Sequence, residues 1–184
     1  MRADAQSNRD QILAAAQVVF RELGVDVPMK AIADRAGVGV GTLYRRFPDR
    51  ESLISAAGYE YLSGLAESAE TARREEGAAW PALCRFLREC AGLRLGAMAS
   101  ALEPNLHDEL RGDPNLTAVR ARVADLVARM TAQAQAEGDL RADVTAEDVA
   151  HLMTLQVYAH PKGQTYAEAI ARTMEIVLDG LRAR

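Results

Sequence analysis

Residues 29 to 47 read Met29-Lys-Ala-Ile-Ala-Asp-Arg-Ala-Gly-Val-Gly-Val-Gly-Thr-Leu-Tyr-Arg-Arg-Phe47, and this stretch decides the fold of the N-terminal region. It holds two short apolar patterns with helical periodicity, separated by a turn that contains Gly37. Two short helices joined by a glycine-containing turn of roughly three or four residues make a helix-turn-helix. The stretch therefore predicts helices at Met29–Ala36 and at about Val40–Phe47.

Helix packing and turn geometry explain the residue types at several positions of this stretch. Ala33 is small where the two helices would cross, and Gly37 supplies a turn conformation that costs other residues energy. The apolar core expected beneath the two helices consists of Ile32, Val38, Leu43 and Phe47.

The outward side of the second helix mixes small, hydroxyl-bearing and cationic side chains. If Leu43 and Phe47 face inward, the residues left outside are Val40, Gly41, Thr42, Tyr44, Arg45 and Arg46. A glycine lets a helix approach a DNA groove closely, a valine can touch a thymine methyl, and hydroxyls and guanidiniums reach phosphates or base edges. By periodicity alone, the pattern also fits an ordinary helical hairpin with two solvated arginines.

The flanking segments also have helical periodicity. Upstream, Asn8 can cap a helix that Gly24 ends, with Gln11 completing a capping box. Downstream, Asp49 caps a long fourth helix, which gives way to a loop in the charged segment 73–77. Further helices are expected at 81–102, 116–137, 145–158 and 166–182, with an irregular connection over 103–114 that can include one helical turn and a break at 160–163. The chain is therefore expected to be all-α, with about nine helices.

Composition limits the class of protein. The 184 residues are 49% hydrophobic but only 5% aromatic, which is enough for one sizeable core or two small ones. No run approaches the roughly 18 apolar residues of a membrane span and the first residues are polar, so a cytoplasmic protein without membrane contact is expected. Cys84 and Cys90 fall on different faces of an expected helix, too far apart for a relaxed disulfide, and are interpreted as small buried apolar residues.

Charge is segregated along the chain. The net charge is −4, yet residues 1–50 hold eight Lys or Arg against six Asp or Glu, whereas residues 51–184 hold fourteen against twenty. A basic N-terminal part on an acidic body fits a small nucleic-acid-binding domain. The predicted division is a helix-turn-helix domain at 1–50 and a helical domain at 51–184.

Residues 37–53, Gly-Val-Gly-Val-Gly-Thr-Leu-Tyr-Arg-Arg-Phe-Pro-Asp-Arg-Glu-Ser-Leu, resemble the signature of tetracycline-repressor (TetR) family regulators. Ile12, Phe20 and Gly24 precede the signature at the expected distance, so the resemblance covers about 45 residues. It implies a transcription regulator, most simply a repressor that binds double-stranded operator DNA and is released by a small, largely apolar effector. A ligand-responsive activator of the same architecture is an alternative.

The resemblance also implies roles for single residues. Thr42 and Tyr44 would contact phosphates or thymine methyls, Arg46 replaces a frequent histidine at a phosphate, and Arg50 replaces the usual lysine. Lys30 stands where some members read a base. Two further residues at variable positions, Val40 and Arg45, would choose the operator sequence. The departures are Met29 and Gly39, where a serine or threonine is common at the helix start.

The C-terminal body carries no comparable motif. Residues 138–149 are similar to the loop before the penultimate helix of many members, which implies a homodimer formed by the last two helices. The interface residues expected there are Val149, Leu152, Met153, Ile170, Met174, Val177, Leu178 and Leu181. An effector pocket is expected among Trp80, Phe86, Leu87, Met98, Leu126, Met130 and Tyr158, although aromatic and methionine residues at helical spacing are more often plain core.

Other classes of function lack support in the sequence. The spacing of His107, His151 and His160 shows no metal-binding pattern, and no cofactor is expected. A small helical enzyme is the competing class, but there is no Gly-x-Ser-x-Gly, no phosphate-binding glycine loop and no His-Glu-x-x-His. A non-enzymatic DNA-binding regulator is therefore the prediction.

Overall fold

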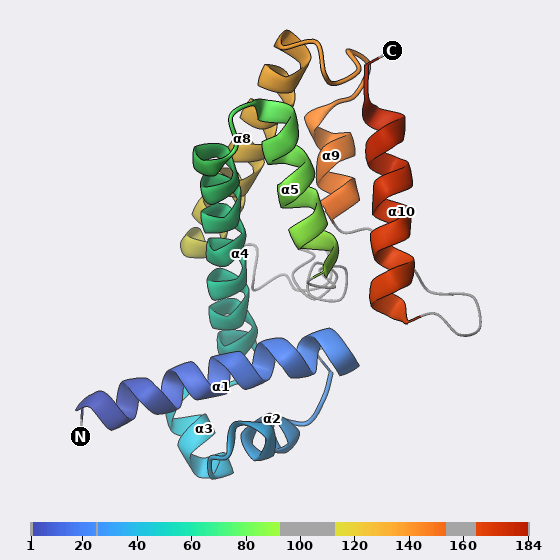
Figure 1. Ribbon diagram of the computed structural model, residues 1–184. Helices are drawn as coiled ribbons and strands as arrows, with labels where there is room; N and C mark the ends of the chain where they lie inside the picture. Colours follow the sequence, from blue (N-terminus) through green and yellow to red (C-terminus); the bar gives the residue numbers. More distant parts are fainter. Residues whose placement is uncertain (1, 25, 93–112, 154–164, 184) are drawn as a thin grey trace. The chain divides into compact units, whose positions relative to one another are not determined.

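The computed structural model describes residues 2–24, 26–92, 113–153 and 165–183. Within these ranges the chain forms eight α-helices and no strand, and one isolated antiparallel bridge pairs Leu140 with Arg182. The helices, labelled as in Figure 1, are α1 (Arg2–Leu23), α2 (Met29–Ala36), α3 (Val40–Arg46), α4 (Arg50–Glu75), α5 (Ala79–Gly92), α8 (Pro114–Ala136), α9 (Ala146–Met153) and α10 (Tyr166–Leu181). The prediction of an all-α chain is confirmed, and the number of helices is close to that expected.

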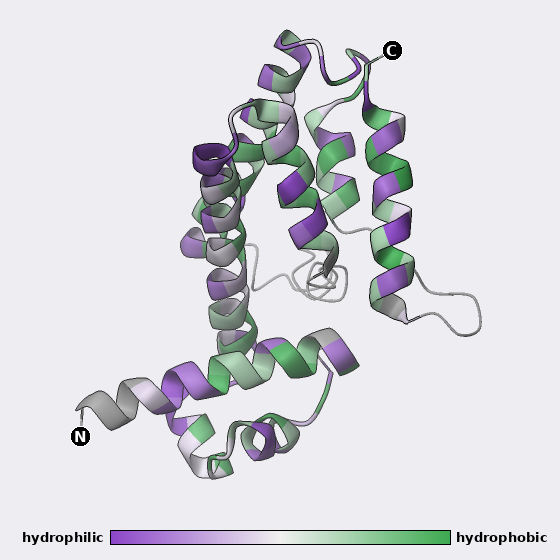
Figure 2. Cartoon of the chain, viewed as in Figure 1, coloured by the Kyte–Doolittle hydropathy of each residue, from purple (hydrophilic) through white to green (hydrophobic). Residues whose placement is uncertain are grey.

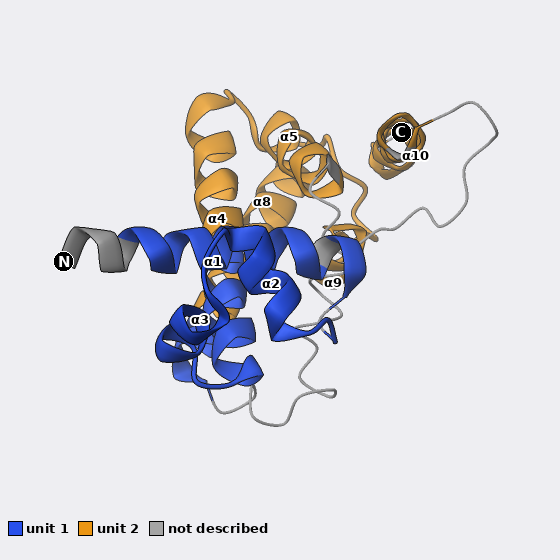
Figure 3. Cartoon of the chain, turned by 90° about the horizontal axis from the view of Figure 1, so that it is seen from below, with its two compact units in different colours: residues 1–62, 97–118 blue, residues 63–96, 119–184 orange. Residues whose placement is uncertain are grey.

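The chain separates into two compact units (Figure 3). Unit 1 comprises Met1–Leu62 and Ala97–Ala118, and unit 2 comprises Ser63–Gly96 and Val119–Arg184. Because α4 and α8 cross the divisions at residues 62 and 118, each of these two helices contributes residues to both units.

Unit 1 is built around a single apolar cluster. Helix α1 lies beside α2 and α3 (Figure 1), and α1, α2, α3 and the first part of α4 all contribute side chains to the cluster. Phe20, Ile32 and Leu43 have no exposed surface there, and Leu116 from the first turn of α8 is equally buried in the same cluster. The helix-turn-helix therefore rests on a core that α1 and α4 complete.

Unit 2 is organised around α5. Helices α9 and α10 pack against it (Figure 1), and buried apolar residues such as Phe86 of α5 and Met174 of α10 fill the interior. Figure 2 shows apolar and polar residues alternating around α5 and α10, as expected for helices with one buried face. Across the surface, Arg88 Nε lies 2.6 Å from Glu175 Oε1 and ties α5 to α10.

Local sequence signals placed most helix ends correctly. Helix α2 spans the predicted residues, and Gly37 ends it with a φ of 69°. Asp49 caps α4, since its Oδ1 accepts from the backbone N–H of Ser52 at 2.7 Å. Thr145 Oγ1 likewise accepts from the N–H of Asp148 at 3.1 Å, at the start of α9.

Four expected boundaries were wrong, and one of them is the start of α8, which lies at Pro114 rather than Leu116. Helix α1 begins at Arg2 rather than Asn8, because the arginine, alanine and glutamine upstream are good helix formers. The loop expected over 73–77 starts later, since α4 continues to Glu75. The helix expected from Pro81 starts at Ala79, because the first turn of a helix tolerates a residue without an N–H.

Parts of some expected elements, 93–102, 103–112 and 154–158, lie outside the described residues, as does the break at 160–163. Within the described part of the chain, no helix has both the length and the hydropathy needed to cross a membrane. Cys84 and Cys90 are free and buried, as expected, and burial raises the pKa of their thiols to about 11 and about 12.

Candidate nucleic-acid interface

The turn between α2 and α3 is fixed by backbone hydrogen bonds. Gly37 adopts the left-handed conformation, in which its N–H donates to the carbonyl of Asp34 at 3.2 Å. The N–H of Val38 donates to the carbonyl of Ala33 at 3.1 Å. The turn thus closes the end of α2 and starts α3 two residues after Val38.

Burial fixes which side of α3 faces out. Leu43 is fully buried and Phe47 is 4% exposed, while Val38 packs partly buried against the same cluster as Ile32. The predicted core of the helix-turn-helix is therefore confirmed. Because this core holds α3 by one side, the remaining residues of the helix are directed to solvent.

Two large apolar side chains are exposed on the outward side of α3. Val40 is 42% exposed and Tyr44 is 48% exposed, and Gly41, Arg45 and Arg46 are exposed beside them. Thr42 is half-buried. Large apolar side chains exposed among cations on a seven-residue helix are typical of a binding surface rather than of a solvated one.

Gly41 is not required by packing inside the protein. A Cβ atom built at this position has no heavy atom within 4 Å, and its φ is not in the left-handed region. The absence of a side chain therefore leaves the surface of α3 open to a close external contact.

Three cationic side chains of the site already have hydrogen-bond partners within unit 1. Lys30 Nζ lies 2.6 Å from Asp34 Oδ2, and Arg45 Nη2 donates to Thr42 Oγ1 at 2.9 Å. Arg50 Nη1 donates to the carbonyl of Val27 at 2.7 Å, which ties the start of α4 to the connection between α1 and α2. Sequence reasoning missed this second, structural role of Arg50, because no local pattern relates residues 27 and 50.

Comparison with known proteins matches both parts of the chain. Residues 12–57 match the family model described as bacterial regulatory proteins, tetR family, and residues 78–183 match the model of the C-terminal domain of SbtR-like transcriptional regulators. The chain belongs to the TetR family. As members of this family, the chain and its relatives are transcription regulators rather than enzymes.

Solved structures of TetR-family regulators resemble this chain over its full length. The TetR transcription regulatory protein of Mycobacterium vanbaalenii is 30% identical, with 99% of each chain covered and a TM-score of 0.68. A TetR transcriptional regulator of Streptomyces coelicolor is 32% identical over 95% of this chain and 98% of its own, with a TM-score of 0.66. An HTH-type transcriptional regulator of Staphylococcus aureus is 46% identical over 54 residues, so the match spans 29% of that curated relative.

The residues expected to line an effector pocket are largely core residues in unit 2. Trp80, Phe86, Leu87, Leu126 and Met130 are each at most 5% exposed. Met98 and Tyr158 lie outside the described residues. Of the five that are described, Met130 lines a small crevice of about 240 Å³ together with polar residues such as Arg73 and Gln133.

One buried polar group in unit 2 escaped sequence reasoning. Thr131 is 3% exposed, and its Oγ1 has no hydrogen-bond partner among the residues that the structure describes. A buried hydroxyl without a partner costs about 1–3 kcal/mol. No signal in the sequence marks it, because Thr131 sits inside an ordinary amphipathic helix.

The residues expected at a dimer interface divide into two groups. Half-buried residues with some surface left are Leu152, Val177 and Leu181, whereas Val149, Met153, Ile170, Met174 and Leu178 are at most 8% exposed within the single chain. Helix α10 packs on α5, which accounts for the burial of its inner side. Ile176, which sequence reasoning left out, is 64% exposed on α10.

Proposed function

We propose that this TetR-family chain is a repressor that binds double-stranded operator DNA as a homodimer and is released by a small, largely apolar effector. The observation that carries the proposal is the outward side of α3, where exposed Val40, Tyr44, Arg45 and Arg46 surround a glycine with open space above it. A helix held by its inner side, with such a surface outward, is suited to the major groove. The division into a DNA-binding part at 1–50 and an effector-binding part at 51–184 belongs to the same proposal.

Contacts to the phosphate backbone are assigned to cations around α3. Arg46 at the end of α3 and Lys30 on α2 are exposed and can reach phosphates, although Lys30 must exchange the carboxylate of Asp34 for a phosphate. Arg50 keeps one nitrogen on the carbonyl of Val27 and is proposed to add a phosphate contact. Thr42 and Tyr44 supply hydroxyls to the same backbone.

Sequence preference is assigned to Val40 and Arg45, and Gly41 lets α3 approach the groove floor closely. The hydrogen bond from Arg45 to Thr42 holds the guanidinium along α3 before DNA arrives. An arginine held in this way loses less conformational freedom when it pairs with a guanine edge.

The effector is proposed to bind in unit 2. Its interior is apolar around Phe86, Leu126 and Met130, which favours an apolar ligand. The hydroxyl of Thr131, which has no hydrogen-bond partner among the described residues, favours one that also carries a hydrogen-bonding oxygen or nitrogen. Such a ligand shifts the protein between two states only if it binds them with unequal affinity.

The dimer is proposed to form through α9 and α10, as four helices from two chains. Exposed Ile176 and half-buried Val177 and Leu181 on α10, with Leu152 on α9, offer an outward apolar surface for this contact. The fully buried residues of the same helices support that surface from the inside.

The salt dependence of DNA binding tests the proposal. If Lys30, Arg46 and Arg50 each neutralise one phosphate per subunit, a dimer makes about six contacts and log affinity should fall against log salt with a slope of about −5. Arg46→Ala should flatten that slope by about one to two units on any DNA, whereas a change at Arg45 should alter the preferred operator by about 1–3 kcal/mol at one base pair per half-site. The operator would be selected from random DNA with the purified chain, and a flat slope in the wild type would refute the phosphate contacts.

Release by an effector is tested on the same complex. The selected operator would be labelled with a fluorophore, and small apolar molecules that carry one polar group would be screened for its release from the wild-type protein. Molecules that release it should lose potency on Thr131→Val, which removes the hydroxyl and keeps the shape. A molecule that saturates the protein without changing operator affinity would count against the release mechanism, while leaving the DNA-binding role intact.

A further inference from the structure

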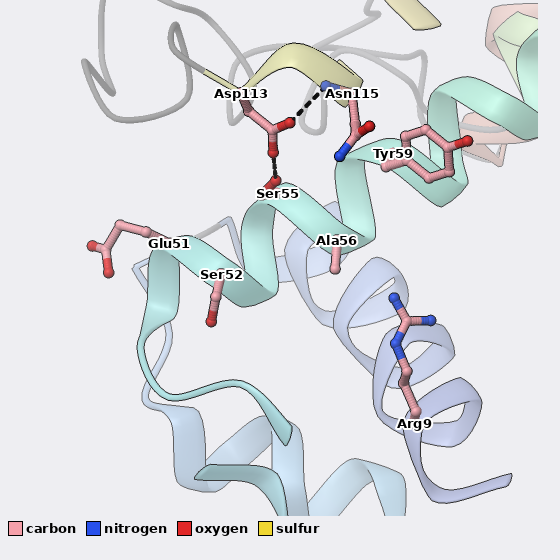
Figure 4. A pocket seen from close by; sticks show the side chains of 8 residues that line it. All are labelled: Arg9, Glu51, Ser52, Ser55, Ala56, Tyr59, Asp113 and Asn115. Atoms are coloured by element: carbon pink, nitrogen blue, oxygen red, sulfur yellow. Dashed lines mark hydrogen bonds between the residues drawn. The ribbon is translucent and has the colours of Figure 1, made fainter. Parts of the chain in front are cut away.

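The carboxylate of Asp113 is shared between two helices of unit 1. One oxygen, Oδ1, accepts from the backbone N–H of Asn115 at 2.8 Å and from that of Leu116 at 3.2 Å, and so caps the start of α8. The other oxygen, Oδ2, accepts from the hydroxyl of Ser55 on α4. Figure 4 shows Asp113, at the start of α8, directed at Ser55. Both residues line a groove of about 640 Å³.

An apolar contact accompanies this hydrogen bond. Leu116, three residues beyond Asp113, is fully buried in the same cluster as Leu53, Ile54 and Ala57 of α4. The first turn of α8 thus has two anchors in unit 1, a charge-assisted hydrogen bond from Ser55 of α4 and the burial of Leu116 in the cluster. The cluster also contains Leu43 and Phe47, which fix α3.

Only α4 and α8 contribute described residues to both units, and the Ser55–Asp113 contact joins these two helices within unit 1. A helix of 23 residues is stiff, so fixing its first turn limits the directions that its remaining turns can take. A dimer that reads two half-sites one helical turn apart must present its two DNA-binding parts about 34 Å apart.

We propose that Ser55 and Asp113 are positioning residues for operator binding: they hold the first turn of α8 to α4 and thereby set the spacing of the two α3 helices in the dimer. This inference rests on the proposed DNA-binding function. Neither residue contacts DNA in the proposal. Loss of the contact lowers the fraction of dimers with the correct spacing, and the apparent affinity for a two-half-site operator falls in proportion to that fraction.

The experiment compares two DNA duplexes. One holds the full selected operator, and the other holds one intact half-site with the second half-site replaced by random sequence. Ser55→Ala removes the hydroxyl on α4 and leaves the cap of α8 intact, and Asp113→Ser keeps a capping oxygen but is too short to reach Ser55. For both variants, affinity for the full operator should fall at least about fivefold, with unchanged affinity for the single half-site and an unchanged salt slope.

Ser68→Ala is the matched control. Ser68 lies on the same helix α4, and its hydroxyl donates in the same way to a carboxylate, that of Glu89 in unit 2. The Ser68→Ala variant should lose about as much thermal stability as Ser55→Ala and keep full operator affinity. Ser55→Thr, which retains a hydroxyl, should keep most of the affinity that Ser55→Ala loses.

The outcomes separate this inference from the proposed function. Equal losses on both duplexes would show a general loss of the folded DNA-binding unit and would overturn the positioning role. Unchanged operator affinity in Ser55→Ala would overturn it as well, although a wild type that binds with a steep salt slope would still support the proposed function. A wild type without DNA binding would instead refute the function itself.

Discussion

Gly41 is the residue of α3 whose replacement separates folding from DNA binding. It is exposed within a helix, and a Cβ at this position meets nothing within 4 Å. Gly41→Ala should therefore raise the free energy of unfolding by about 0.5–1 kcal/mol, because alanine loses less backbone entropy in a helix. If α3 approaches the groove closely at this point, the same methyl group should weaken operator binding at least about tenfold. Urea unfolding and operator titration of the one variant measure both effects.

Gly64 supplies the control for Gly41→Ala. It is also an exposed glycine inside a helix, α4, and a methyl group added there would likewise meet no heavy atom within 4 Å. Gly64→Ala should give a similar gain in stability and leave operator affinity unchanged. If Gly41→Ala were more stable and bound the operator as well as the wild type, the close approach assigned to this residue would be wrong.

Carboxylate side chains accept hydrogen bonds at the start of two helices, α4 and α9. The backbone N–H of Ser52, and then its side chain, lower the pKa of Asp49 at the start of α4. The backbone N–H of Thr145 and its hydroxyl lower the pKa of Asp148 in the same way. A carboxyl group whose pKa is lower in the folded state stabilises the fold above its unfolded pKa, and this contribution is lost as the pH falls through the folded value.

Acid should therefore loosen the start of α4. Urea unfolding between about pH 6 and about pH 3 should show a free energy that falls once the pH drops below about 4. Asp49→Asn keeps an oxygen for the cap but cannot titrate, so its loss of stability over this range should be smaller. Asp148→Asn tests the cap of α9 in the same way. Identical pH profiles for the wild type and both variants would rule out the caps as the source of the effect.

Helix α10 has one side buried in its own chain and one side exposed. Met174 is fully buried against the chain's own interior, while Ile176, two residues on, is 64% exposed. Met174→Glu should lower the free energy of unfolding by at least about 3 kcal/mol, because an unpaired charge would enter the core. Ile176→Glu should leave the subunit folded and shift the dimer toward monomer, since its side chain is the one that a second chain can cover.

Sedimentation at micromolar concentration and circular dichroism distinguish the two effects. Leu23→Glu serves as the control, because Leu23 is 69% exposed on α1, far along the chain from α10, and receives the same change of charge. It should stay dimeric. A fully dimeric Ile176→Glu protein would show that the outward side of α10 is not the interface, and a folded Met174→Glu protein would contradict the burial of that residue.

Features that depend on residues close together in the chain could be predicted from the sequence alone. The residues of α2 and α3, the turn at Gly37 and the burial of Leu43 and Phe47 all follow from spacings of a few residues, since the helical period fixes which residues share a face. The family that the comparisons show was predicted from the resemblance carried by residues 37–53.

Which face of a helix packs against which other helix could not be predicted from the sequence. The run Ile176-Val177-Leu178 is apolar throughout, and only the packing of α10 on α5 shows that Leu178 is inside and Ile176 outside. The bond between Ser55 and Asp113 and the one from Arg50 to Val27 join residues far apart in the chain. No local pattern specifies such pairs, because they form only when the folded core brings their helices together and the energy of each contact depends on that geometry.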